Sequence, residues 1–476
     1  MSIRRTKTKI LATLGPSASS EEMILKLVDA GVNGFRLNFS HGDHEYYKNL
    51  FESINRVCET RKLPIPIIQD LQGPKIRIGK LVSDKINIKE GNNIEITIDN
   101  IEGDENIISS SYKSLVDDAQ IGETILIDDG LIKLEVESKK ERSLICKIID
   151  GGILKPKKGM NLPGMKLSTP ALTEEDKKNL EFALNFRVDF VALSFVRSAK
   201  DIIELRKWLE ERGHNKKIIA KIEKPEAVAN FEDILEVADV IMVARGDLGV
   251  ELPPQLLPII QKKIIRRCNE VGKLVITATQ MLESMISNPV PTRAEASDVA
   301  NAVLDGTDVV MLSGETAAGN YPIKSVKIMR DILLSVQAER AFLANVRWQI
   351  PIDKIENIFD ATAKGFTQIA DQVGVDAIIV FTHQGRQAMR MSKYNPNADI
   401  YAFSDDFAIL NSLNLHKSIT PLYLKNINDE DYYMTRSVEI LKENGFLHSG
   451  DLVLFAAGAP LAEVERKSWV RFKVIE

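Results

Sequence analysis

The sequence predicts an α/β protein: a (β/α)8 TIM barrel, with a small all-β barrel domain inserted into it as a lid and an α/β domain at its C-terminal end. Short, almost continuously apolar strands alternate with helical patterns near the start and again from about residue 190, which is typical of a parallel sheet covered on both faces. The stretch between them has alternating apolar runs and frequent turn residues, and a fresh strand–helix alternation begins after about residue 345. We expect a barrel at 1–74 and 167–345, a lid at 75–166 and a C-terminal α/β domain at 346–476.

The barrel strands are predicted from apolar runs that end in turn or polar residues. The first run ends at Gly15-Pro16, and the helix after it begins at Ser20 and ends at Gly31, which are typical start and stop signals. The clearest later helices are expected at 292–304 and 323–338. The eight strands are expected at 9–14, 34–39, 66–70, 190–194, 218–222, 240–244, 274–278 and 309–313.

The predicted insertion lies in the third βα loop, at the mouth of the barrel. Its Ile-x-Ile runs at 86–88 and 94–98 are separated by turn glycines such as Gly91, so we expect a β-rich lid over the mouth. The C-terminal domain is expected to contain strands at 377–381, 399–403, 421–424, 452–455 and 469–474.

Composition and charge exclude several classes of protein. The 476 residues include 62 Lys and Arg and 67 Asp and Glu, a net charge of −5, which argues against a nucleic-acid binder held by bulk positive charge. The three cysteines, Cys58, Cys146 and Cys268, are far apart and predict reduced thiols rather than a disulfide framework or a zinc ribbon. The start has no signal-peptide pattern, and no apolar run reaches the roughly 18 residues of a membrane span. We expect a cytoplasmic protein with no nucleic-acid or membrane partner.

Polar residues follow the ends of most predicted barrel strands, where the function of such barrels gathers. Glu223 and Asp247 follow neighbouring strands, and two carboxylates with room for water and substrate oxygens suit Mg²⁺. Lys221 lies on the same side of its strand as Glu223 and, with Arg36, suits a phosphoryl group. Other polar residues at this rim are Asn38, Ser40, His41, Asp70, Gly246, Thr279, Ser313 and Glu315.

Each of these residues also has an ordinary structural interpretation. A lone Lys-x-Glu on a strand is more often a surface pair, and a lone Asp247 could cap the following turn. Their joint placement after consecutive strands favours a functional site. The chain has no His-Glu-x-x-His motif, and both of its Gly-Lys pairs are followed by Leu, so neither a zinc hydrolase nor a Walker A loop is expected.

At these residues the sequence closely resembles the pyruvate kinase family. The resemblance is strong from residue 5 to about 335, and the C-terminal domain matches in pattern only. The matching motifs are RLNFSHG (36–42), KKGMNLPG (157–164), IIAKIEKP (218–225), MVARGDLGVE (242–251), ATQMLESM (278–285), PTRAEASDVANAVLDG (291–306) and MLSGETAAGNYP (311–322).

The resemblance implies the last step of glycolysis, in which phosphoenolpyruvate and ADP give pyruvate and ATP. It implies that Glu223 and Asp247 hold Mg²⁺ or Mn²⁺ and that Arg36 and Lys221 engage the phosphoryl group. The backbone of Gly246 and Asp247, with Thr279, would bind the substrate carboxylate; Thr279 would also lie near the carbon that is protonated, although the proton donor stays open. The implied nucleotide contacts are Arg77, Lys158, Asn38 and His41.

One stretch departs from the family pattern. Most members hold K⁺ at positions that match Asn38, Ser40, Asp70 and Leu71, and have Thr-Lys-Gly-Pro-Glu after the aspartate. Here Asp70 is followed by Leu-Gln-Gly-Pro-Lys75. A lysine in place of that glutamate would repel K⁺ and fill its role, so we expect K⁺ to be dispensable. The alternative is that Lys75 is a solvated hinge lysine.

The resemblance also implies a homotetramer regulated through the C-terminal domain. The effector loop is expected at 382–387, where only Thr382 remains of the Ser and Thr hydroxyls that the family uses for a sugar bisphosphate. The downstream segment is EVERK (463–467), so we expect no activation by fructose 1,6-bisphosphate; another phosphorylated effector would contact Arg386. Two rival functions stay open: a metal-dependent carbon–carbon lyase acting on phosphoenolpyruvate, and a non-catalytic metabolite sensor.

Overall fold

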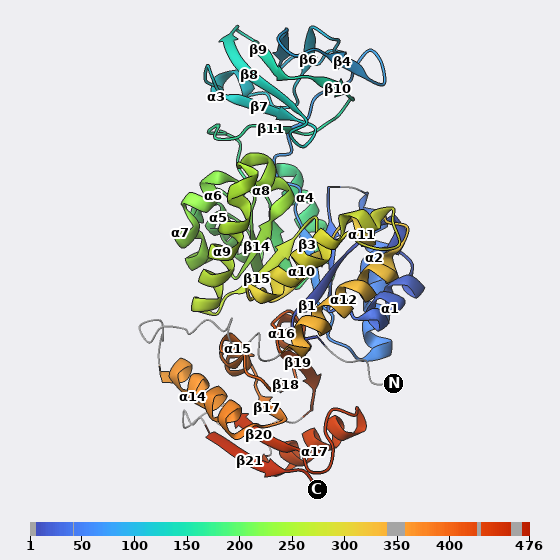
Figure 1. Cartoon of the computed structure of the whole chain (residues 1–476), viewed down its shortest axis with the longest axis vertical. Coiled ribbons are helices and arrows are strands. Elements are labelled where there is room, and N and C mark those ends of the chain that lie inside the picture. Colours follow the sequence, from blue (N-terminus) through green and yellow to red (C-terminus); the bar gives the residue numbers. More distant parts are fainter. Residues whose placement is uncertain (1–5, 41, 340–357, 426–429, 458–468) are drawn as a thin grey trace.

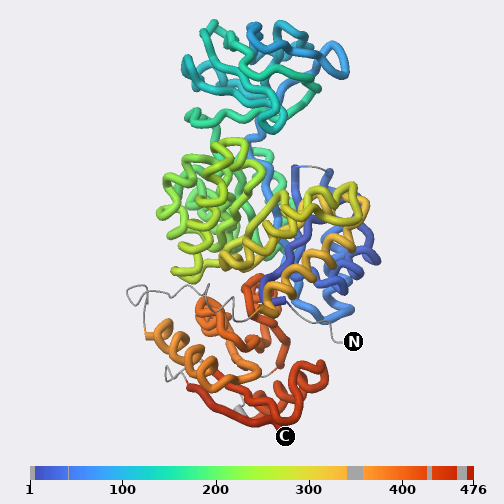
Figure 2. The backbone as a smooth tube through the Cα atoms, in the orientation of Figure 1, coloured from blue at the N-terminus to red at the C-terminus, as the bar shows by residue number. Residues whose placement is uncertain are grey.

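The computed structural model describes residues 6–40, 42–339, 358–425, 430–457 and 469–476. Three parts follow one another along the long axis of the molecule: a β-rich lid, a barrel and a C-terminal α/β domain (Figures 1 and 2). No helix in these ranges is both long enough and apolar enough to cross a membrane. The residue boundaries of the three parts stay predictions, and the predicted boundary between 345 and 346 lies outside the described ranges.

The barrel is closed by eight parallel strands in the order β1-β16-β15-β14-β13-β12-β3-β2. Its strands are buried almost throughout, as expected for a parallel sheet covered by helices. Each predicted strand agrees with the structure to within one residue at either end, so the predicted fold class is confirmed. The bounds are β1 Lys9–Leu14, β2 Gly34–Asn38, β3 Ile67–Asp70, β12 Phe190–Leu193, β13 Lys217–Ile222, β14 Val240–Ala244, β15 Leu274–Ala278 and β16 Val309–Leu312.

The barrel helices begin and end at the residues that the sequence marks for this. Ser20 accepts a hydrogen bond from the Met23 amide at the start of α1, and Gly31, at φ 125°, ends that helix. Thr292 and Glu295 form a capping box at the start of α10. The α-helices are α1 Glu21–Ala30, α2 His44–Arg61, α4 Glu174–Ala183, α5 Ala199–Glu210, α6 Pro225–Ala229, α7 Phe231–Val237, α8 Arg245–Glu251, α9 Leu257–Val271, α10 Arg293–Leu304, α11 Gly314–Ala317 and α12 Pro322–Ala338. Short 3-10 helices lie at Pro16–Ala18, Pro254–Leu256 and Glu283–Ile286.

The lid is the β-rich insertion between β3 and α4, as predicted. Its strands form a six-stranded sheet, β11-β7-β8-β9-β5-β6, and a two-stranded sheet, β10-β4, around a core of isoleucine and leucine side chains. One short helix, α3 Leu115–Asp118, was not expected in an all-β domain. The strands are β4 Ile86–Ile88, β5 Asn93–Thr97, β6 Ile107–Ser109, β7 Thr124–Ile127, β8 Ile132–Lys139, β9 Ser143–Asp150, β10 Gly152–Leu154 and β11 Met160–Asn161.

The C-terminal domain has a five-stranded sheet in the order β19-β18-β17-β20-β21, in which only β21 is antiparallel to its neighbour. The strand expected at 421–424 begins two residues earlier. The elements are α14 Ile358–Val373, β17 Ala377–Phe381, α15 Arg386–Lys393, β18 Asp399–Ser404, α16 Phe407–Leu413, β19 Ile419–Tyr423, α17 Glu430–Glu443, β20 Leu452–Ala457 and β21 Trp469–Val474.

The C-terminal domain docks on the amino-terminal end of the barrel, opposite the lid. Lysines at the starts of two barrel strands make two of the contacts: Lys9 Nζ donates to the carbonyl oxygen of Ile419 at 2.6 Å, and Lys217 Nζ donates to Ser412 Oγ at 2.5 Å. Both strands run from this interface to the opposite rim, so the interface and the rim share elements of the same sheet.

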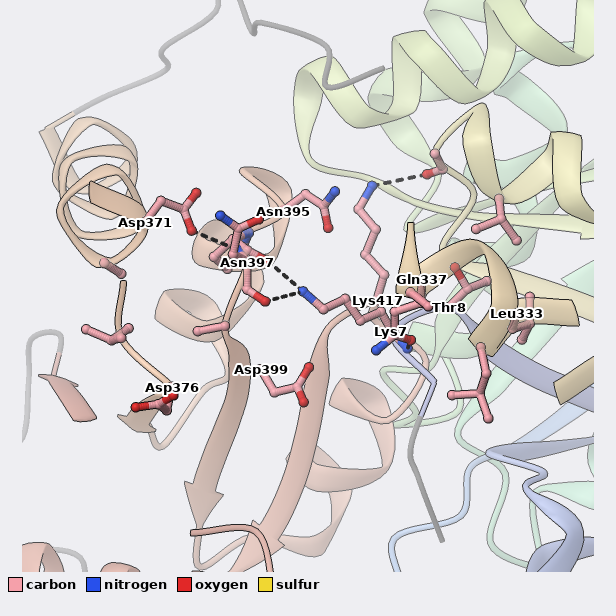
Figure 3. Close-up of a pocket in the computed structure, with 18 of the residues that line it drawn as sticks. Lys7, Thr8, Leu333, Gln337, Asp371, Asp376, Asn395, Asn397, Asp399 and Lys417 are labelled. Atoms are coloured by element: carbon pink, nitrogen blue, oxygen red, sulfur yellow. Dashed lines mark hydrogen bonds between the residues drawn. The ribbon is translucent and has the colours of Figure 1, made fainter. Parts of the chain in front are cut away.

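A cavity of about 510 Å³ lies in this interface. Lys7 Nζ reaches across it to the carbonyl oxygens of Pro396 and Asn397, at 2.8 and 2.7 Å (Figure 3). The carboxylates of Asp371 and Asp399 line the wall of the cavity that the C-terminal domain forms. The cavity therefore lies at the end of the barrel opposite the polar rim that the sequence singles out.

Candidate active site

The carboxyl ends of the barrel strands bring most of the predicted site residues to one rim. Parallel pairing places Asn38, the last residue of β2, beside Asp70, the last residue of β3. Lys221 lies near the end of β13, Gly246 and Asp247 follow β14, and Thr279 follows β15. Adjacent strand ends in a closed barrel meet around one mouth, so these residues share it.

A continuous chain of charged groups crosses this rim. Arg36 Nε donates to Asp70 Oδ2 at 2.6 Å, and its Nη1 donates to Thr13 Oγ1 at 3.1 Å. Lys221 Nζ lies 3.4 Å from Asp70 Oδ1 and 2.6 Å from Glu223 Oε1. These side chains are buried, so the two cations are fixed by carboxylates rather than by solvent.

Two residues after β12, Ser194 and Phe195, complete this cluster and were not predicted as site residues. Ser194 Oγ is 2.7 Å from Lys221 Nζ, and the Phe195 amide donates to Glu223 Oε2 at 2.9 Å. Phe195 has a φ of 57°, which is unusual for a bulky residue and turns its amide toward the carboxylate. The available signal was their position directly after a predicted barrel strand.

The charges of the cluster stabilise one another. Burial acts to raise the pKa of Asp70, but the charges of Lys221 and Arg36 outweigh it and hold that pKa below its usual range. Burial acts to lower the pKa of Lys221, yet Asp70 and Glu223 raise it well above its usual range. Lys221 therefore keeps its positive charge throughout the physiological pH range.

Thr279 and Gly246 form a second group at the rim. The Gly246 amide donates to Thr279 Oγ1 at 2.7 Å, which joins the residues after β14 and β15. Thr279 and Gln280 have φ values of 67° and 54°. This conformation is strained for Thr279, which is β-branched. Arg245, which the sequence places after β14 without indicating its role, holds this turn by donating to the carbonyl oxygens of both residues, at 2.8 and 3.2 Å.

Glu223 and Asp247 fit a hard divalent cation by the chemistry of their donor atoms. Glu223 is buried, whereas Asp247 is exposed at the mouth, and their parent strands β13 and β14 are neighbours. Among the described residues no cluster of three or more His, Cys, Asp or Glu side chains could hold a metal. Two carboxylates that leave room for water and substrate oxygens are the usual arrangement for Mg²⁺, which rarely takes an all-protein cage.

Oxygens of three of the four residues predicted for a K⁺ pocket accept hydrogen bonds from protein donors. Asp70 accepts from Arg36, and the carbonyl oxygen of Leu71 accepts from Ser194 Oγ at 2.7 Å. The Ser40 amide donates to Asn38 Oδ1 at 3.4 Å.

Lys75 lies close enough to Asp247, Lys221 and Glu223 for their charges to act on it. Burial lowers the pKa of Lys75, and the charge of Arg77 lowers it further, while Asp247 and Glu223 oppose the change. The charges of the two candidate metal-binding carboxylates therefore act on the ammonium group of Lys75, although the residue as a whole is exposed.

The predicted nucleotide contacts of the lid lie at its hinge. Arg77 Nη1 donates to the carbonyl oxygen of Lys157 at 3.1 Å, and Lys158 pairs with Asp128 at 2.7 Å. No contact that the structure records joins Arg77 or Lys158 directly to the rim cluster. His41 lies outside the described residues.

The predicted effector loop forms a tight turn before α15. The Gly385 amide donates to Thr382 Oγ1 at 2.8 Å, so the one remaining hydroxyl of the loop is used within it. His383 lies 3.3 Å from Asp405. Residues 463–467 lie outside the described residues.

Comparisons with known proteins find similarity along almost the whole chain. The model of the pyruvate kinase barrel domain matches residues 5–326, and that of the pyruvate kinase alpha/beta domain matches residues 360–471. Pyruvate kinases of Staphylococcus aureus strains MRSA252 and USA300 are each 42% identical over 475 residues, which cover 98% of this chain and 80% of those proteins. The crystal structure of a pyruvate kinase from Cryptosporidium parvum superimposes with a TM-score of 0.90 at 35% identity, over 99% of this chain and 96% of that one.

Proposed function

The chain belongs to the pyruvate kinase family, an enzyme family that transfers the phosphoryl group of phosphoenolpyruvate to ADP, and from this we propose that the cluster around Lys221 carries out the transfer here. Transfer of a phosphoryl group needs positioning and neutralisation of spread negative charge more than covalent chemistry. The observation that carries the proposal is that two buried cations, Arg36 and Lys221, are held at one rim by buried carboxylates. Charges fixed in this way need no reorganisation during the reaction.

We assign the remaining roles from the same geometry. Glu223 and Asp247 would hold Mg²⁺ or Mn²⁺, which when bound supplies positive charge to the substrate oxygens. The Gly246 and Asp247 amides and Thr279 would bind the substrate carboxylate. Because the Gly246 amide donates to Thr279 Oγ1 in this structure, the carboxylate would have to take over that hydrogen bond. Arg77, Lys158, Asn38 and His41 are proposed as nucleotide contacts on family resemblance.

The test is a coupled assay for pyruvate formation from phosphoenolpyruvate, run with and without ADP and with and without Mg²⁺. We expect pyruvate to form only when both ADP and the metal ion are present. Phosphoenolpyruvate consumption without ADP would favour the carbon–carbon lyase, and substrate binding without turnover would favour the metabolite sensor. A homotetramer in the cytoplasm is proposed on resemblance alone, and sedimentation equilibrium would measure the assembly.

Replacing either candidate metal ligand should raise the Mg²⁺ requirement sharply. We expect Glu223→Ala and Asp247→Ala each to shift the half-saturating Mg²⁺ concentration at least tenfold, because each removes one of two carboxylates from the site. The measurement is the initial rate as a function of free Mg²⁺. Glu232→Ala is a matched control, since Glu232 lies on α7 and pairs with Arg267 at 2.9 Å. A metal titration that matches the wild type would remove the replaced residue from the site.

Fructose 1,6-bisphosphate should not activate this enzyme. The hydroxyl of Thr382 is bonded within its own loop, and the hydroxyl-rich loop that the family uses for the sugar bisphosphate is absent from the sequence. We expect the phosphoenolpyruvate saturation curve to be the same with and without the sugar. A shift of the curve to lower phosphoenolpyruvate concentration would contradict this. A different phosphorylated effector would contact Arg386, and its effect would be lost in Arg386→Ala.

A further inference from the structure

The strand that returns from the lid, β11, is bonded to a buried carboxylate of the barrel, Glu251. Glu251 ends α8, four residues after Asp247, and is 6% exposed. Its Oε1 accepts a hydrogen bond from Asn161 Nδ2 of β11 at 3.0 Å and lies 2.5 Å from Lys224 Nζ. Three segments of the chain therefore meet at a single oxygen atom: the lid, the helix that carries Asp247, and the loop after β13.

The same loop carries the other candidate metal ligand. Lys224 follows Glu223 directly, and its Nζ lies 5.4 Å from the centre of the Phe195 ring. Phe195 in turn donates its amide to Glu223 Oε2. A Cβ on Gly73 would lie 2.7 Å from Phe195 Cδ2, so the strand that leaves the barrel for the lid packs closely against this ring. The outgoing connection of the lid thus packs against Phe195, which is bonded to Glu223, and the returning strand is bonded to Glu251, which pairs with the residue after Glu223.

Two further observations set Glu251 apart from an ordinary surface carboxylate. Its Oε2 is buried and has no hydrogen-bond partner among the described residues, which is unfavourable for a carboxylate and needs an explanation. The neighbouring Val250 faces the lid: a Cβ on Gly130 would lie 3.7 Å from Val250 Cγ1. The end of α8 therefore meets the lid at two adjacent residues.

We propose that Glu251 is a positioning residue for the phosphoryl transfer, one that joins the lid to the two carboxylate-bearing segments of the metal site. This rests on the proposed function, in which Glu223 and Asp247 bind the metal ion and the lid contacts the nucleotide. Glu251 acts through Lys224 on the loop of Glu223, through α8 on Asp247, and through Asn161 on the lid. Removing the Asn161–Glu251 hydrogen bond should therefore weaken the binding of ADP. Removing the charge of Glu251 should also weaken the binding of the metal ion.

Asn161→Ala tests the lid bond alone, because it leaves the Lys224–Glu251 pair in place. We expect the KM for ADP to rise roughly tenfold, since a hydrogen bond to a charged group is lost. The KM for phosphoenolpyruvate, the affinity for Mn²⁺ and the Tm should stay at their wild-type values. Asn93→Ala is the matched control: it removes an asparagine bond to Glu137, 2.9 Å long, that stays within the lid. An unchanged KM for ADP, or equal rises in both KM values, would overturn the proposal.

Glu251→Gln tests the link to the metal site. We expect the Kd for Mn²⁺, measured by electron paramagnetic resonance without substrates, to rise roughly tenfold to a hundredfold, as when a group that orients metal ligands is replaced. Glu223→Gln distinguishes a failure of the proposed metal site from a failure of the positioning role of Glu251. If Glu223→Gln leaves Mn²⁺ binding unchanged, the proposed metal site is wrong and this inference fails with it. If Glu223→Gln weakens Mn²⁺ binding and Glu251→Gln does not, only the positioning role of Glu251 is refuted.

Discussion

Lys221→Met should lower kcat by roughly a hundredfold to a thousandfold, the usual effect of removing one fixed charge from the transition state. Lys221 Nζ is held by Ser194, Asp70 and Glu223, at 2.7, 3.4 and 2.6 Å. Arg36, the other cation of the cluster, cannot take its place without breaking its own bonds to Asp70 and Thr13. Because Asp70 and Glu223 raise the pKa of Lys221, the side chain keeps its charge at every pH at which the enzyme is assayed. The rate loss should therefore be the same at pH 6 and at pH 8.

The variant also removes a partner from two buried carboxylates, so its fold has to be checked separately. Asp70 keeps its bond to Arg36, which limits the damage, and circular dichroism and the Tm report the fold. Lys200→Met is the matched control, because Lys200 is an exposed lysine on α5 that pairs only weakly with Glu204 at 3.6 Å. Retention of more than half the wild-type rate by Lys221→Met would refute the catalytic role of Lys221.

The second large effect concerns potassium: the wild-type enzyme should work without K⁺, and Lys75→Glu should create a K⁺ requirement. At an effective dielectric constant of about 20, two like charges about 4 Å apart repel by roughly 4 kcal/mol, and solvent lowers this for an exposed group such as Lys75. A lysine beside Asp247 and Glu223 would thus exclude K⁺ and supply its charge. Without K⁺, Lys75→Glu should be slower than the wild type by roughly a hundredfold, as for the loss of one fixed charge, and K⁺ should restore the rate.

The measurement is the initial rate at constant ionic strength with K⁺ exchanged for tetramethylammonium. Lys80→Glu makes the same charge change at an exposed lysine of the lid and should stay independent of K⁺. A large loss of wild-type activity on the exchange, or a Lys75→Glu variant that does not respond to K⁺, would show that Lys75 is a solvated hinge lysine.

The barrel could be predicted from the sequence because its strands are short apolar runs that end in turn or polar residues. Such a run marks the buried strand and its carboxyl end together, so Lys221, Glu223 and Asp247 could be placed on one rim. The strand pairing within the lid could not be predicted in the same way. Its strands alternate with a period of two, which gives the buried face but not the partner, and β5 pairs with β6 in parallel and with β9 in antiparallel.

The missed site residues share a physical reason. Ser194 ends an apolar strand as an ordinary small polar residue, and only closure of the barrel brings it to Lys221. Arg245 stabilises the turn at Thr279 and Gln280, whose positive φ values have no sequence signal because neither residue is glycine. Glu251 lies within one of the family motifs, but its contact with Asn161 joins two residues 90 positions apart, so the sequence does not indicate its role.

The docking of the C-terminal domain on the barrel has a mechanical consequence. Lys217, at the start of β13, is bonded to Ser412 of that domain, and Lys221 lies four residues further along the same strand. At about 3.3 Å per residue, this strand spans about 13 Å between the C-terminal domain and the rim cluster around Lys221, with no loop between its ends. A rigid tilt of the C-terminal domain would therefore be transmitted along this strand and would displace Lys221.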